Sequence, residues 1–70
     1  MVYVKFKEKF KGKMLSGTFL KKFRSENQAI KELGVWNGLK RSDKIVIKGV
    51  YNKRPVGFRK TKYAGILKEK

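Results

Sequence analysis

The sequence predicts an α+β domain: a small, mostly antiparallel β-sheet in the order β-β-α-β, with one short helix packed on one face of the sheet. Three observations lead to this prediction. Residues 2–11 alternate between apolar and polar side chains, residues 44–51 form the densest β-branched run, and a helix-start signal begins at Ser25.

The C-terminal residues allow two interpretations. Residues 58–63 fit a further edge strand, and they equally fit a flexible basic arm that orders only on binding. We therefore expect a single basic domain over residues 1–58, followed over residues 59–70 by a basic arm or an edge strand. Pro55 lies in the turn-forming segment before them and excludes a central strand there.

The run from Lys44 to Tyr51 is predicted to be the central strand, because its β-branched residues favour a strand. Strand alternation places Ile45, Ile47 and Tyr51 on one face, which is expected to close the core. The other face carries lysines beside apolar side chains: Lys44, Val46, Lys48 and Val50.

Residues 2–11 are predicted to form a half-buried strand that turns at Gly12. Its apolar side chains share one face and are expected in the core: Val2, Val4, Phe6 and Phe10. Its other face carries Tyr3 and four alternate lysines: Lys5, Lys7, Lys9 and Lys11. The returning strand is predicted over residues 15–24, and its apolar residues share one face: Leu15, Phe19 and Phe23.

The helix is predicted to begin with a capping box. The Ser25 hydroxyl is placed to accept from the Gln28 N–H, and the Gln28 side chain is placed to return to the Ser25 N–H. The helix has two predicted ends: it stops at Gly34, or it continues to Asn37 and adds Trp36 to its buried stripe. With either end, Trp36 is expected to cover the core.

Composition argues against several classes of protein. Seventy residues without cysteine form one domain that no disulfide braces. The chain has no histidine, no obvious carboxylate pair and no Gly-rich phosphate loop, so we expect no enzyme, no cofactor and no metal site. No apolar run approaches the roughly 18–20 residues of a membrane span, and no signal peptide follows Met1. We therefore expect a cytoplasmic protein without a membrane partner.

The net charge of +15 is unevenly distributed along the chain. Residues 1–24 carry eight basic residues and one acidic residue, residues 25–43 carry three of each, and residues 44–70 carry nine basic residues and one acidic residue. The neutral segment is the predicted helix, so the positive field belongs to the strands and the C-terminal residues. Such a field attracts phosphate backbones, anionic lipid or acidic proteins, and it exceeds what solubility requires.

Basic residues interleaved with aromatic residues are the candidate binding site. Alternate strand residues lie about 6.5–7 Å apart, close to the phosphate spacing of an extended single strand. The aromatic residues beside the basic ones suit either base stacking or core packing: Tyr3, Tyr51, Phe58 and Tyr63. The candidate nucleic-acid-binding residues are Lys5, Lys7, Lys9, Lys11, Arg24, Lys48, Lys53, Arg54, Arg59, Lys60 and Lys62.

Three short segments follow one another over residues 18–50: a basic strand, a helix entered through "SENQAIKELG", and "LKR" leading into the isoleucine-rich strand "KIVIKGV". In these features the chain resembles the archaeal ribosomal protein LX family. The distance from helix to strand is about one helical turn shorter here than in that family. The resemblance implies ribosomal RNA as a ligand.

The leading hypothesis is a non-enzymatic protein that binds RNA or DNA through the phosphate backbone with weak sequence specificity. Sixteen of the 20 basic residues are lysine, which contacts phosphate as a point charge and lacks the rigid fork of arginine. The alternative is a small regulatory or inhibitory protein, for example virus-encoded, that binds an acidic surface of a nucleic-acid-processing enzyme. Exposed edge strands would permit a dimer, so the oligomeric state stays open.

Overall fold

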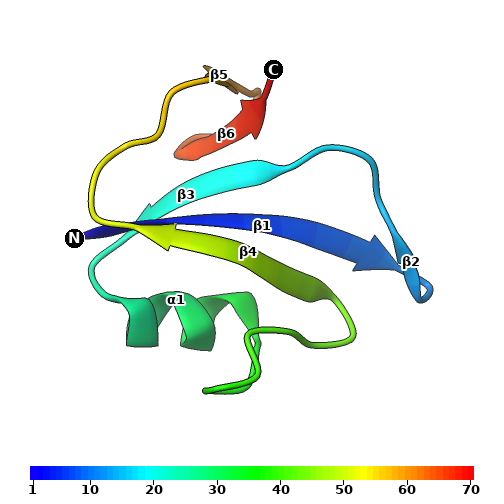
Figure 1. Ribbon diagram of the computed structural model, residues 1–70. Coiled ribbons are helices and arrows are strands. Elements are labelled where there is room, and N and C mark those ends of the chain that lie inside the picture. The colour runs from blue at the N-terminus through cyan, green and yellow to red at the C-terminus, as the bar shows by residue number, and fades with distance from the viewer.

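All of residues 1–70 are described by a computed structural model, which contains one helix and six strands joined in a single sheet (Figure 1). The elements in chain order are β1 (Val2–Phe10), β2 (Lys13–Met14), β3 (Phe19–Phe23), α1 (Glu26–Leu33), β4 (Ile45–Tyr51), β5 (Phe58–Lys60) and β6 (Ile66–Glu69). Each pair of neighbouring strands is antiparallel. The predicted α+β class, with one short helix on a mostly antiparallel sheet, is confirmed.

β4 lies at an edge of the sheet, and β1 is the interior strand beside it. β1 pairs with β4 on one side and with β3 on the other, and β6 and β5 follow beyond β3. The prediction that residues 44–51 form the central strand was therefore wrong. β4 pairs with no strand besides β1, although an isolated bridge joins Arg41 to Val46. The β-branched residues of β4 indicate a strand that packs on the core. They do not indicate its place in the sheet, because strand composition does not specify the order of the strands.

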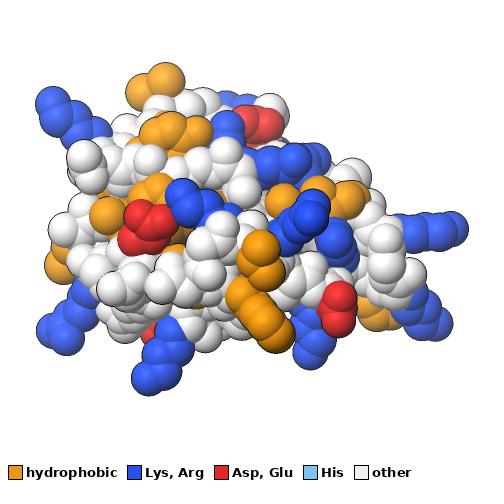
Figure 2. Space-filling model, turned by 60° about the horizontal axis from the view of Figure 1, so that its bottom comes forward, with side chains coloured by type: hydrophobic (Ala, Val, Ile, Leu, Met, Phe, Trp, Pro, Cys, Tyr) orange, Lys and Arg blue, Asp and Glu red, His pale blue; other side chains and the backbone are white.

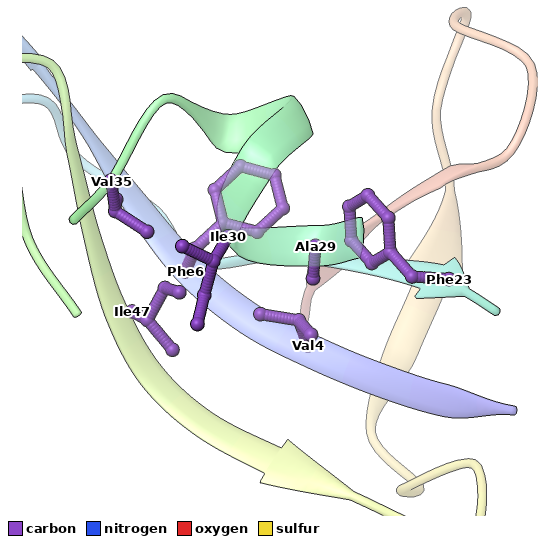
Figure 3. Packing of buried hydrophobic residues seen from close by; sticks show 7 residues of the cluster. All are labelled: Val4, Phe6, Phe23, Ala29, Ile30, Val35 and Ile47. Carbon is purple, nitrogen blue, oxygen red and sulfur yellow. The ribbon is translucent and has the colours of Figure 1, made fainter. Parts of the chain in front are cut away.

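The main core lies between α1 and the sheet (Figure 3). Val4 and Phe6 of β1 belong to the same buried cluster as Ala29 and Ile30 of α1. The other buried members of the cluster are Phe23, Val35 and Ile47. Phe19 extends the core at its margin, where its ring stacks on that of Phe6 with centroids 6.0 Å apart. Burial of each large apolar side chain contributes about 1.5–3 kcal/mol, so this layer supplies most of the stability.

A β-bulge interrupts the pairing of β1 with β4. Phe6 pairs with Ile47, but the preceding residue of β1, Lys5, pairs with Gly49. Lys48 is therefore an extra residue without a partner on β1. One extra residue reverses the alternation of the strand, so side chains after the bulge point to the face opposite to that of a regular strand.

Val50 and Tyr51 exchange faces because of this bulge. Val50 pairs with Val4 and packs against the core, whereas Tyr51 pairs with Tyr3 on the face opposite to α1. The prediction that Tyr51 shares the face of Ile47, with Val50 on the other face, was wrong because it assumed a regular strand.

The returning half of the N-terminal hairpin is also interrupted. The chain turns at Gly12, as predicted, but β2 ends at Met14 and pairing with β1 resumes only at Phe19. A continuous strand over residues 15–24 was therefore a wrong prediction. Phe10, expected in the core, is 63% exposed. The helix is too short to cover it, because eight helical residues span about 12 Å while nine strand residues span about 30 Å.

The start of α1 follows the predicted capping signal in part. The Ser25 Oγ accepts a hydrogen bond from the Gln28 N–H at 3.2 Å. The Gln28 side chain donates to Glu32 at 3.3 Å and does not return to the Ser25 N–H, so half of the predicted capping box forms. α1 has neither the length nor the apolar composition of a membrane-spanning helix.

The helix ends at Gly34, the earlier of its two predicted ends. Gly34 has a left-handed φ of 72°, and the Val35 N–H donates to the Ile30 carbonyl at 3.1 Å. Val35 then enters the core, while Trp36 is 72% exposed. The prediction that Trp36 covers the core was wrong, because ending the helix at Gly34 removes Trp36 from the helical stripe.

The C-terminal residues form a hairpin that extends the sheet. β6 pairs with β3, and β5 pairs with β6 at the edge (Figure 1). The Thr61 hydroxyl donates to the Ile66 carbonyl at 2.8 Å and holds the connection between the two strands. Leu20 pairs with Leu67 and is fully buried, although it lies outside the main cluster. The hairpin thus contributes a second, smaller apolar contact.

Replacing Ile47 with Val should lower the free energy of unfolding by about 0.5–1.5 kcal/mol, and replacing it with Ala by about 2–5 kcal/mol. The side chain is buried in the main core, and a domain of this size has only about 3–5 kcal/mol in total. Urea denaturation followed by circular dichroism measures the change. The matched control is Val46→Ala on the opposite face, which should cost less than Ile47→Ala. Equal losses in the two Ala variants would contradict this placement of the core.

Candidate nucleic-acid interface

The face of the sheet opposite to α1 carries a row of three side chains, one lysine and two tyrosines, from β3, β1 and β4. In this row Tyr3 pairs with Lys22 on one side and with Tyr51 on the other. Lys5 lies in the next row, where it pairs with Gly49. Paired residues of antiparallel strands lie about 4.5–5.5 Å apart, so these side chains form one continuous surface. We call this surface the outer face and define it by Tyr3, Lys5, Lys7, Lys22 and Tyr51.

Lysine amines lie near the tyrosine rings of this surface. The Nζ of Lys22 is 6.0 Å from the ring centroid of Tyr3, and the Nζ of Lys5 is 5.8 Å from that of Tyr51. Such a contact between an amine and a ring contributes about 0.5–1 kcal/mol at an exposed site. This energy is small enough for the amine to leave the ring and contact a phosphate group. The salt bridge of the structure joins Lys40 to Glu26, and no carboxylate forms a salt bridge with the amines of Lys5 and Lys22.

The Tyr51 ring packs against the sheet at Gly49, because glycine has no side chain there. A Cβ built at Gly49 would lie 2.6 Å from the Tyr51 hydroxyl oxygen and 2.8 Å from the ring carbon that carries it. The ring therefore covers the backbone of Gly49, and any larger residue there would displace it. A ring that lies along the sheet leaves its other face available for stacking.

A hollow of about 430 Å³ opens beside the outer face. Its basic and aromatic lining residues are Tyr3, Lys21, Lys22, Arg54, Lys60 and Tyr63. None of the five carboxylates of the chain lines it, whereas Asp43 lines both of the other large hollows. This hollow is therefore the concave site best suited to an anion.

Four of the predicted binding residues lie at this surface. Lys5 and Lys7 alternate along β1 on the outer face, and both are partly exposed. Arg54, in the loop after β4, and Lys60, at the end of β5, line the hollow. Strand pairing brings these residues together from three separate parts of the chain.

The other predicted binding residues lie elsewhere. β1 ends at Phe10, so Lys9 belongs to the strand while Lys11 lies in the turn, and both line a different hollow at the hairpin tip. Arg59 and Lys60 are neighbours on β5 and so point to opposite faces of the sheet. Four more are exposed on loops or at the bulge: Arg24, Lys48, Lys53 and Lys62.

Lys22 was missing from the predicted site, although the sequence contains a signal for it. Phe19 and Phe23 both face the core, so strand alternation alone places Lys22 on the opposite face. The position of Tyr51 beside it had no such signal, because the bulge at Lys48 depends on the pairing with β1.

No protein-family model, curated protein or solved structure matches this chain. The resemblance to the archaeal ribosomal protein LX family therefore stays an expectation from three short segments. The function is inferred below from the geometry and charge of the surface.

Replacing Gly49 with Ala should displace the Tyr51 ring and leave the fold intact. The obstructing atoms belong to the far end of a side chain that can rotate, so the ring moves before the backbone does. Proton NMR measures the result as a shift of the Tyr51 ring resonances and a loss of their contacts to residue 49. The ring resonances of Tyr63, in a loop outside β4, serve as the internal control. Unchanged Tyr51 resonances would show that the ring does not cover Gly49.

Proposed function

We propose that this protein is a non-enzymatic nucleic-acid-binding module that holds single-stranded RNA or DNA on its outer face. The observation that carries the proposal is the continuous row of Lys22, Tyr3 and Tyr51 beside a basic hollow that no carboxylate lines. Amines for phosphates and rings for bases are the two elements that single-strand-binding surfaces combine.

Phosphate contacts supply most of the affinity in this proposal. Lys5 and Lys7 lie about 6.5–7 Å apart along β1, a spacing suited to successive phosphates of an extended strand. Lys22, Arg54 and Lys60 surround the adjoining hollow and take further phosphates. Because lysine predominates, the contacts depend on charge rather than on base identity, so sequence specificity is weak.

The tyrosines make the surface selective for unpaired bases. Tyr3 and Tyr51 are paired neighbours on the sheet, and Tyr63, 61% exposed, lines the same hollow as Tyr3. Bases of a duplex are stacked on one another and cannot reach these rings, whereas unpaired bases can. Each base stacked on an aromatic ring contributes about 1–3 kcal/mol.

Replacing Lys5, Lys22 and Lys60 with Gln should weaken binding to single strands of every sequence alike. If each lysine contacts one phosphate, the slope of log K against log salt should flatten by about 2, at roughly 0.7 per contact for single strands. Fluorescence polarisation with labelled mixed-sequence oligonucleotides at several salt concentrations measures both quantities.

The matched control replaces Lys13, Lys31 and Lys70 with Gln. These residues are exposed on β2, on α1 and at the C-terminal end, so the variant loses the same charge away from the outer face. An equal loss of affinity and slope in both triple variants would show that only the net charge matters. Such a result would remove the outer face as the binding site.

Replacing Tyr51 with Leu should weaken binding to a single strand by about 5- to 150-fold, the equivalent of the roughly 1–3 kcal/mol of one stacked base. Binding to a duplex of the same sequence should not change. Tyr51→Phe keeps the ring and should bind as the unaltered protein does. Equal behaviour of Tyr51→Leu and Tyr51→Phe, with both folded by circular dichroism, would rule out stacking on this residue.

A further inference from the structure

A second surface of the protein is apolar and lies on the side of the helix. Trp36 is 72% exposed, Phe10 63% and Leu39 59%. Figure 2 brings this side forward and shows hydrophobic side chains at the surface between basic ones. Large aromatic side chains exposed in a group are uncommon on a monomer and mark interaction sites.

Local hydrogen bonds hold Trp36 in its exposed position. Its carbonyl accepts from the N–H groups of Leu39 and Lys40 at 3.0 and 3.2 Å, which closes a turn. Lys40 is tied to α1 by its salt bridge to Glu26 at 3.2 Å, and its carbonyl accepts from Ile47 of β4 at 2.9 Å. Val35, the residue before Trp36 in the chain, is buried in the core. The exposed ring therefore stands on an ordered segment.

Two adjoining hollows accompany the apolar side chains. One of about 680 Å³ is lined by Trp36 and Leu39, and the other, of about 520 Å³, is lined by Phe10. Both hollows share the same wall, formed by Lys9, Leu33, Asp43 and Lys44. We call this continuous surface the helix-side patch and define it by Phe10, Leu33, Trp36 and Leu39 together with the charged residues that line the two hollows.

The charges around the helix-side patch select the kind of partner. Its rim carries four basic residues, Lys9, Lys11, Arg41 and Lys44, against the carboxylates of Glu8 and Asp43. A second copy of the chain would bring the same excess of positive charge and be repelled. A partner with negative charge and apolar side chains complements both properties of the patch.

The carboxylates and the hollows distinguish among anionic partners. Glu8 and Asp43 line this patch, which disfavours a run of phosphates, whereas no carboxylate lines the hollow beside the outer face. Concave sites beside an aromatic ring bind individual apolar side chains of a protein partner. A bilayer surface has no side chains that could enter these hollows. We infer that the helix-side patch binds an acidic protein segment that inserts apolar side chains beside Trp36. This inference is independent of nucleic-acid binding at the outer face.

The chain contains a single tryptophan, so its fluorescence reports directly on the patch. The probe is a synthetic peptide that repeats Glu-Glu-Leu-Phe, added to the protein. We expect a blue shift of the Trp36 emission that saturates with peptide concentration and weakens with salt. The same peptide with Gln in place of Glu, and a poly-Glu peptide without apolar residues, should each bind at least roughly tenfold more weakly, because each lacks one of the two complementary properties.

Two pairs of variants locate the binding site. Arg41→Gln with Lys44→Gln should weaken peptide binding roughly fivefold, while Lys22→Gln with Lys60→Gln removes the same charge at the other surface and should change it little. Trp36→Ala, measured by calorimetry, should weaken binding by at least about tenfold without loss of stability, since the side chain is largely exposed. Equal losses in the two double variants, or no loss in Trp36→Ala, would overturn the assignment.

Two further probes test the competing partners. Oligothymidylate should leave the Trp36 emission and the affinity for the peptide unchanged, because it is expected on the outer face. Vesicles of phosphatidylcholine with phosphatidylserine should cause no blue shift. A shift with vesicles but not with peptide would assign the patch to anionic lipid, and displacement of the peptide by oligothymidylate would assign it to nucleic acid. The absence of any shift with the peptide would refute an acidic partner.

Discussion

The pairing of β1 with β4 is the interaction on which both the core and the outer face depend. β4 contributes Ile47 and Val50 to the core side, although these residues are three apart and a regular strand would place them on opposite faces. The extra residue Lys48 resolves this conflict by reversing the alternation. The same reversal brings Tyr51 beside Tyr3, so one bulge both completes the core and builds the aromatic row.

The small size of the helix explains why the protein has an exposed apolar surface. An eight-residue helix covers only part of a nine-residue strand, and the main core lies where the two overlap. Beyond the helix, Phe10 and Trp36 stay exposed because no element remains to cover them. Such exposed aromatic side chains mark a candidate contact surface.

Charge separates the two surfaces of the protein. The outer face and its hollow combine amines and tyrosine rings without a carboxylate. The helix-side patch combines tryptophan and phenylalanine with both kinds of charge. The two proposed ligands, which differ in chemistry, would therefore bind on opposite sides of one sheet.

The sequence by itself determined the features that depend on short-range patterns. The Ser25 cap, the inward face of Val4 and Phe6 and the strands around Phe19 and Ile47 follow from neighbours a few residues apart. Lys5 and Lys7 were placed on one face for the same reason. Gly34 was one of the two helix ends that the same short-range pattern allowed. Only the tertiary structure decided the order of the strands, the bulge at Lys48, the exposure of Trp36 and the gathering of Tyr3, Tyr51, Arg54 and Lys60. These features depend on which strands pair and in which register, and that choice depends on contacts between residues far apart in the chain.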